Sequence, residues 1–153
     1  MTSPSRTEVY KQFQTGQEKY VYFLLAASAS AIGLAVQQTR VAALGWSQLP
    51  LAAAVVLWGV SFYAGCRGRS YTLSALYTNF GMLTAQDGAH PIVQQLGNHP
   101  DAIRIFTEES HKIMERQSNA AGFWTILQFR LLICGAMFYL AWHVLEMVRR
   151  VPC

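Results

Sequence analysis

The sequence predicts an all-α membrane protein with three transmembrane helices and a cytoplasmic helical hairpin between the second and the third. Only 13% of the 153 residues are charged and 52% are hydrophobic, whereas an average soluble domain has about 25% charged residues. Three apolar stretches come close to or exceed the roughly 20 residues that a helix needs to cross a hydrocarbon core of about 30 Å. No strand-like alternation of polar and apolar residues accompanies them.

The N-terminal segment, residues 1–19, is polar and carries Val9, Tyr10 and Phe13 at helical spacing. This pattern predicts a disordered start followed by a short helix on the membrane surface. A cleaved signal peptide is not expected, because the first apolar run begins only at Tyr20, after a region of mixed charge.

The first two spans are expected to form an antiparallel transmembrane hairpin over residues 20–66. Residues 20–36 are apolar or small, and small residues that recur four apart allow membrane helices to approach closely. A short connector follows, and Pro50 suits the first turn of the next helix. Residues 49–66 are therefore the second predicted span.

A cytoplasmic helical hairpin is expected over residues 67–121. Residues 70–86 have one apolar helical face, and Asp87 with Gly88 ends that helix. Residues 90–100 contain two His-Pro steps, and a residue before proline is pushed out of the helical region. We therefore expect a loop there.

The last helix is expected to begin in water and to end across the membrane. Pro100 and Asp101 are helix-start residues, and no proline follows until Pro152. The polar first half places Glu108 and Lys112 as an i,i+4 ion pair. The second half is almost wholly apolar and makes residues 122–150 the third transmembrane helix.

A polar stripe follows one face of the third span. At about 100° per residue, six side chains fall within about 60° of a common line, and they are the pore-lining candidates: Gln128, Leu132, Gly135, Tyr139, His143 and Glu146. Intramembrane polar groups suggest function, although His143 and Glu146 equally fit the far headgroup boundary if the span is 123–143. Either placement leaves one ionisable group at depth, Arg130 or the His143–Glu146 pair. Several copies packed around a wet centre would relieve this.

The distribution of Lys and Arg predicts the orientation. Eight of them lie in residues 1–19 and 67–121, against three on the opposite side. The positive-inside rule therefore places the N-terminus and the hairpin in the cytoplasm, although Arg149 and Arg150 at the other end argue mildly against this.

Two groups of side chains in the hairpin are candidates for gating by a ligand. Aromatic and basic side chains together can clamp a nucleotide or a single strand, although aromatics at helical spacing more often pack against other helices. Arg104 and His111 fit the loose Arg-x(4–6)-His pattern of HEPN-type ribonucleases, and a solvated charged face is the commoner reason for such a pair. The ligand-gating candidates are Arg67, Arg69, Tyr71, Tyr77, Arg104 and His111.

No metal site, cofactor or catalytic residue is predicted. The four histidines do not form a ligand set, and the three cysteines lack CxxC or Cys/His spacing. We therefore expect a protein that is not an enzyme.

The architecture resembles small multi-pass effectors of bacterial antiphage defence, of the SLATT type or of nucleotide-signalling systems such as CBASS and Hailong. The similar parts are residues 20–36, residues 49–66 and the helical segment from Ser70, while the third span departs from the two-span form. The resemblance implies an effector in the bacterial inner membrane that kills or arrests an infected cell by permeabilising that membrane. Its control would come from a nucleotide, an oligonucleotide or the partner enzyme that makes it.

Three functions follow as hypotheses. The first is a homo-oligomeric pore or ion channel, gated through the cytoplasmic helices. The second is a membrane-anchored ribonuclease that uses Arg104 and His111. The third is a non-catalytic subunit of a larger membrane complex.

Overall fold

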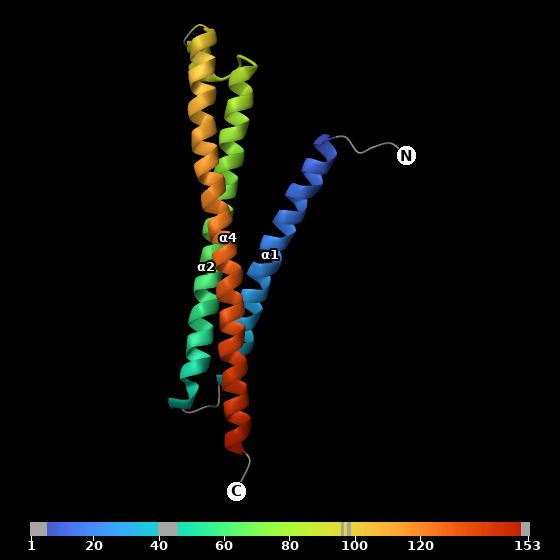
Figure 1. Cartoon of the computed structure of the whole chain (residues 1–153), viewed down its shortest axis with the longest axis vertical. Coiled ribbons are helices and arrows are strands. Elements are labelled where there is room, and N and C mark those ends of the chain that lie inside the picture. Colours follow the sequence, from blue (N-terminus) through green and yellow to red (C-terminus); the bar gives the residue numbers. More distant parts are fainter. Residues whose placement is uncertain (1–5, 40–45, 96, 98, 151–153) are drawn as a thin grey trace, which may run out of the picture. The chain divides into compact units, whose positions relative to one another are not determined.

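The computed structural model describes residues 6–39, 46–95, 97 and 99–150, and within these ranges it is helical with no strand. The elements, in chain order (Figure 1), are α1 (Arg6–Thr39), the 3₁₀ helix η1 (Trp46–Gln48), α2 (Leu49–Gln86), α3 (Pro91–Gln95) and α4 (Pro100–Arg150).

Three stretches are long and apolar enough to cross a membrane: Thr15–Gln38, Trp46–Gln95 and Pro100–Arg149. The prediction of an all-helical protein with three helices of spanning length and composition is therefore confirmed. The start and end of the last helix, Pro100 and Arg150, are also those predicted.

The chain divides into two compact units, and α2 and α4 each contribute to both. The three-helix unit comprises Met1–Cys66 and Thr125–Cys153, and the hairpin unit comprises Arg67–Trp124. The hairpin predicted from the sequence comprises residues 67–121.

The three-helix unit is held together by a small core. Ala35 of α1, Leu51, Ala54 and Trp58 of α2, and Trp142 of α4 are buried together. Small side chains at two of these positions allow the helices to come close, as in other membrane helix interfaces. Large apolar side chains cover the outside instead, such as Phe23, Val56 and Met137, which are 67%, 63% and 64% exposed. An apolar exterior of this kind suits contact with lipid.

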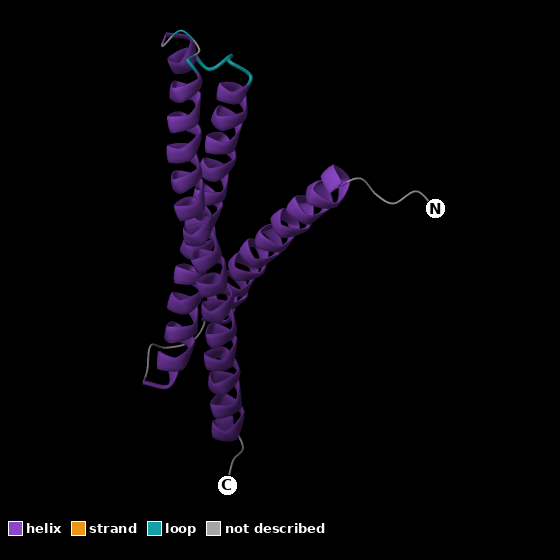
Figure 2. Cartoon of the chain, turned by 45° about the horizontal axis from the view of Figure 1, so that its top comes forward, coloured by secondary structure: helices purple, strands orange, loops and turns teal. Residues whose placement is uncertain are grey.

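The hairpin unit consists of the C-terminal part of α2 and the N-terminal part of α4, which run antiparallel (Figure 2). Gln117 of α4 links them, because its Nε2 donates to Ser74 Oγ at 2.9 Å while its Oε1 accepts from Thr78 Oγ1 at 3.3 Å. These hydrogen bonds add to the limited apolar packing between the two helices of so short a hairpin.

The helix ends in this unit follow ordinary capping rules. Gly88 has a φ of 70°, and the two closing bonds run from Gly88 N to Ala85 O and from Ala89 N to Thr84 O, both 3.0 Å. This is a Schellman motif, which favours glycine at the left-handed position. The prediction that Asp87 and Gly88 end the helix is confirmed.

Two local expectations need correction. Residues 90–100, expected as a loop, contain α3, because Pro91 can occupy a first helical position and the Gln94 amide bonds to His90 O at 3.0 Å. The expected surface helix within residues 1–19 is not separate, since α1 continues from Arg6 through the first span. Disorder is expected at the start of residues 1–19, and residues 1–5 lie outside the described part of the chain. The side chains of Val9, Tyr10 and Phe13 lie outside it as well.

Candidate functional site

A layer of three polar side chains lies in the interior of the three-helix unit, one from each helix. Ser28 of α1, Ser61 of α2 and Gln128 of α4 are each 0% exposed, and we call them the polar layer. Ser28 Oγ donates to Leu24 O at 2.9 Å, the bond to the preceding turn that serine often makes in apolar helices. Ser61 Oγ donates to Gln128 O at 2.7 Å. The two serine hydroxyls are 3.4 Å apart, so the layer connects all three helices.

The Gln128 side chain is the unusual member of the layer. Both its Nε2 and its Oε1 are buried without a hydrogen-bond partner among the described residues. Buried polar side-chain atoms are nearly always paired, and leaving one unpaired costs about 1–3 kcal/mol. An apolar side chain at position 128 would therefore make the three-helix unit more stable than the glutamine does. Packing alone does not explain why a glutamine is present.

Gly65 creates the space that Gln128 occupies. A Cβ at position 65 would lie 2.5 Å from Gln128 Nε2 and 2.8 Å from Leu25 Cδ2. A larger residue at position 65 would therefore force the ends of the Gln128 and Leu25 side chains to move.

A second glycine next to a large side chain, which we call the notch, lies two turns beyond Gln128 along α4. Gly135 is buried, and the indole of Trp58 fills the space beside it while its Nε1 donates to Leu132 O at 3.2 Å. The Trp58 and Tyr139 rings are 5.7 Å apart, and the Tyr139 hydroxyl donates to Gln38 Oε1 of α1 at 3.0 Å. The polar groups of this region therefore join the helices of one chain.

The predicted polar stripe is divided by these contacts. Gln128 and Gly135 are buried and Leu132 and Tyr139 are partly buried, all four against α1 or α2 of the same chain. His143 is exposed, and Glu146 is intermediate in exposure. A pore lined by the first four residues remains a prediction, and it requires the helices of the unit to separate.

Contacts between α2 and α4 align the second predicted span with a part of α4. Ser61 bonds to Gln128 and Trp58 bonds to Leu132, so the helices run antiparallel in this register. At 1.5 Å per residue, residues 49–66 of α2 lie beside about residues 124–141 of α4. Of the two placements considered, this register favours the span at 123–143, with Arg130 inside it.

The ligand-gating candidates belong to the hairpin unit, where two of the six interact directly. The Arg67 guanidinium lies 5.3 Å from the centre of the Tyr71 ring, and its Nη2 is 3.3 Å from the Tyr71 hydroxyl. Tyr77 is 80% exposed. Arg104 lies 3.7 Å from an Asp101 carboxylate oxygen. Of the remaining two, Arg69 is half-buried and His111 is exposed.

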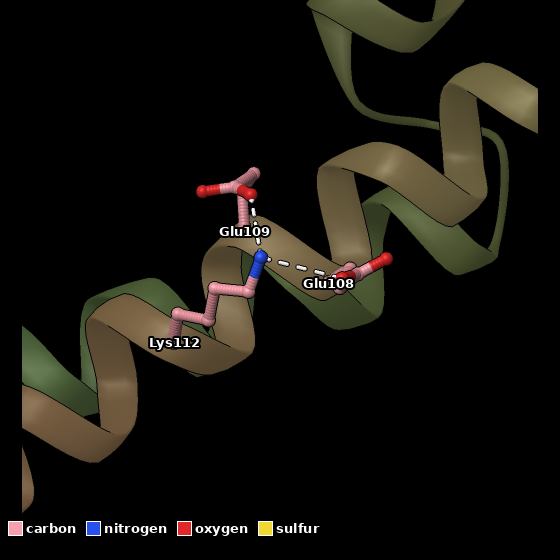
Figure 3. A network of polar contacts seen from close by, with 3 residues as sticks. All are labelled: Glu108, Glu109 and Lys112. Carbon is pink, nitrogen blue, oxygen red and sulfur yellow. Dashed lines mark hydrogen bonds and ion pairs between the residues drawn. The ribbon is translucent and has the colours of Figure 1, made fainter.

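Lys112 forms the clearest ion-pair network of the hairpin unit (Figure 3). Its Nζ lies 3.3 Å from Glu108 and 2.9 Å from Glu109, which confirms the predicted i,i+4 pair and adds a second partner. Hydrogen bonds to Glu109 and then Glu108 raise the pKa of Lys112 above its ordinary value of 10.5. All three side chains are more than half exposed, so the network contributes little to stability.

An apolar groove of about 560 Å³ runs between α3 and the start of α4 in the hairpin unit. Val93, Ile105 and Phe106 contribute to its lining. The His90 ring lies with its centre 4.5 Å from the centre of the Phe106 ring.

Sequence reasoning missed Ser28, Ser61 and Gly65. Two serines inside apolar spans and a glycine near the end of the second span were the available signals. Which residues these three side chains contact depends on how each helix is rotated about its axis, and a single sequence does not specify that rotation.

No group of three or more His, Cys, Asp or Glu residues that could hold a metal is found among the described residues. No protein-family model matches the chain, and no curated protein and no solved structure is significantly similar to it. The class that the fold defines is a helical protein with three candidate transmembrane helices, which supports a membrane location.

Proposed function

We propose that the chain is the subunit of a homo-oligomeric ion channel or pore, and that Gln128 faces the conducting path in the open state. The observation that carries the proposal is the buried, unpaired amide of Gln128 in the polar layer. Polar groups inside membrane segments are expensive and usually functional. In this proposal the described packing is the closed state.

Glutamine at position 128 can be compared with leucine, an apolar residue of similar size. A leucine at position 128 would fill a similar volume beside Gly65 without an unpaired amide. The cost of about 1–3 kcal/mol for each unpaired group disappears once the helices separate and water reaches the layer. Ser28 and Ser61 would then add two hydroxyls to the same wetted surface. The glutamine therefore disfavours the closed packing and favours a hydrated one.

Control through the hairpin unit is the second part of the proposal. Both α2 and α4 continue from the predicted spans into that unit without a helix break. A ligand that changes the packing of Arg67 and Tyr71 could therefore act on the spans through the helices themselves. The proposed ligand is a nucleotide, an oligonucleotide or the enzyme that makes it, and the proposed setting is antiphage defence at the bacterial inner membrane, with the N-terminus cytoplasmic.

The test is ion flux in the full chain and in Gln128→Leu. Purified protein is reconstituted in planar bilayers, and membrane potential is followed in bacteria after induced expression with a voltage-sensitive dye. Because Gln128 disfavours the closed packing, wild type is expected to open part of the time without a ligand, and therefore to conduct and to depolarise the cells. Gln128→Leu is expected to insert normally, to unfold at higher temperature and to lose conductance.

Gln37→Leu is the matched control, because Gln37 is an exposed glutamine near the end of α1. It is expected to conduct like wild type. Conductance that persists unchanged in Gln128→Leu would mean that the polar layer does not line the path. His111→Ala is expected to leave conductance intact, whereas a ribonuclease that uses Arg104 and His111 would lose RNA cleavage.

A further inference from the structure

Arg130 is an exposed cation on the apolar outer face of the three-helix unit. Two exposed neighbours about one turn away, Ile126 and Ile133, are 57% and 48% exposed. Within the described part of the chain, Arg130 has no hydrogen bond and no ion pair. A guanidinium cannot lose its charge in a protein, so it needs an anion or water.

The depth of Arg130 follows from the contacts of its neighbours. Gln128 and Leu132, two residues on either side, bond to Ser61 and Trp58 of α2. Arg130 is therefore level with about residue 60 of α2, about 9 Å inside the end of the second predicted span at Cys66. Helical side chains lean toward the helix N-terminus, and on α4 this direction leads toward the nearer membrane surface. A long basic side chain can cover most of such a distance by snorkelling.

Among the described residues of the three-helix unit, no carboxylate lies at the level of Arg130. The chain has eight Asp and Glu residues, and none falls within residues 20–66 or 123–145. On α1, Ser28 contacts Ser61, and Glu18 lies about 15 Å from that contact along the axis of α1. Glu146 is sixteen residues along α4, or about 24 Å. A neighbouring copy in the same orientation offers the same two acids at the same depths.

We infer that Arg130 binds the phosphate group of a phospholipid in the leaflet at the Cys66 end of the spans. A guanidinium presents a planar fork of donors that matches phosphate oxygens. Anionic headgroups such as phosphatidylglycerol are preferred over phosphatidylcholine, because they carry no ammonium to offset the phosphate. The site needs the chain to be in a membrane but does not depend on conduction.

The first measurement is lipid retention by the full-length protein. Native mass spectrometry compares phosphatidylglycerol with phosphatidylcholine on wild type, Arg130→Leu and Arg130→Lys, with Arg116→Leu as control because Arg116 is an exposed arginine of the hairpin unit. Arg130→Leu is expected to hold phosphatidylglycerol about fivefold less well, the effect of one basic residue at an anionic membrane surface. Arg130→Lys should keep most of the retention, and Arg116→Leu all of it. Equal retention in Arg130→Leu and wild type would overturn the inference.

The second measurement separates lipid from a water-filled lumen. Cys134 is exposed and lies four residues from Arg130, about 40° around α4. With Cys66→Ser and Cys153→Ser it is the last thiol of the three in the chain. A charged, membrane-impermeant maleimide should not label it in proteoliposomes permeabilised to the reagent, and should label it after denaturation. Ser118→Cys, at an exposed position of the hairpin unit, is the positive control. Labelling of Cys134 at the rate of that control would place Arg130 against water and overturn the lipid assignment.

Discussion

Substitution of Gly135 by alanine tests the notch that joins α4 to α2. A Cβ at this position would lie 2.5 Å from Trp58 Nε1, 2.6 Å from its Cδ1 and 3.1 Å from its Cε2. These atoms belong to a rigid indole that is only 5% exposed. The ring has to move, and the bond from Trp58 Nε1 to Leu132 O is then lengthened or lost.

The magnitude comes from three contributions. Overpacking of a well-filled interior costs about 1–3 kcal/mol, and the loss of one hydrogen bond costs about 1 kcal/mol. Alanine is a better helix former than glycine by about 1 kcal/mol, which offsets part of this. We expect Gly135→Ala to destabilise the three-helix unit by about 1–3 kcal/mol.

Gly59→Ala is the matched control, because Gly59 is the residue after Trp58 on α2 and a Cβ there meets nothing within 4 Å. Unfolding of both variants in mixed micelles is followed by tryptophan fluorescence as the fraction of denaturing detergent increases. Gly59→Ala should unfold at the same or a higher fraction than wild type, and Gly135→Ala at a lower one. If both variants behave alike, Trp58 does not occupy the notch at Gly135.

Three smaller effects should also be measurable. Ser61→Ala removes the bond to the Gln128 carbonyl and should lower the free energy of unfolding by about 1 kcal/mol, as measured by the same titration. Gln117→Leu removes two exposed or half-exposed bonds across the hairpin unit and should speed hydrogen exchange in residues 67–124 while residues 49–61 exchange as in wild type. The ion pairs of Lys112 should stabilise the hairpin unit below pH 10.5, the ordinary pKa of lysine. This stabilisation should be lost as the pH rises through the raised pKa of Lys112. Circular dichroism measured against pH, with Lys112→Met as reference, should show this loss as a decrease in the difference in stability between the two proteins. The same difference should be smaller in high salt.

The number and order of the spanning helices could be predicted because the distribution of apolar residues along the sequence determines them. Pro100, Asp87 and Gly88 are local signals, and each ends or begins a helix as expected. The helix at Pro91 departs from the expected loop because the restriction before a proline applies to the preceding residue, whereas proline itself can begin a helix. This difference concerns the backbone conformation at one proline and leaves the predicted order of the spanning helices unchanged.

The candidate site could be predicted only in part, because the inward faces of helices depend on their partners. The stripe through Gln128 was found from its period, but the periodicity could not show that α1 and α2 of the same chain cover it. Ser28 and Gly65 carry no signal of their own in an apolar span, since serine and glycine are common there. Their role emerges only when three helices meet at one level.

Gln128 and Arg130 place polar groups on opposite faces of α4 at nearly the same depth, since two residues are about 200° and 3 Å apart on a helix. No rotation of α4 hides both from hydrocarbon, so packing alone does not explain the pair. The two proposals give them separate roles, and the variants can show this. Gln128→Leu should abolish conductance and leave phosphatidylglycerol retention unchanged, whereas Arg130→Leu should do the reverse. If Arg130→Leu also abolished conductance while Cys134 was labelled from water, the conducting path would run along the outer face of α4, and the polar layer would have to be reassigned to helix packing.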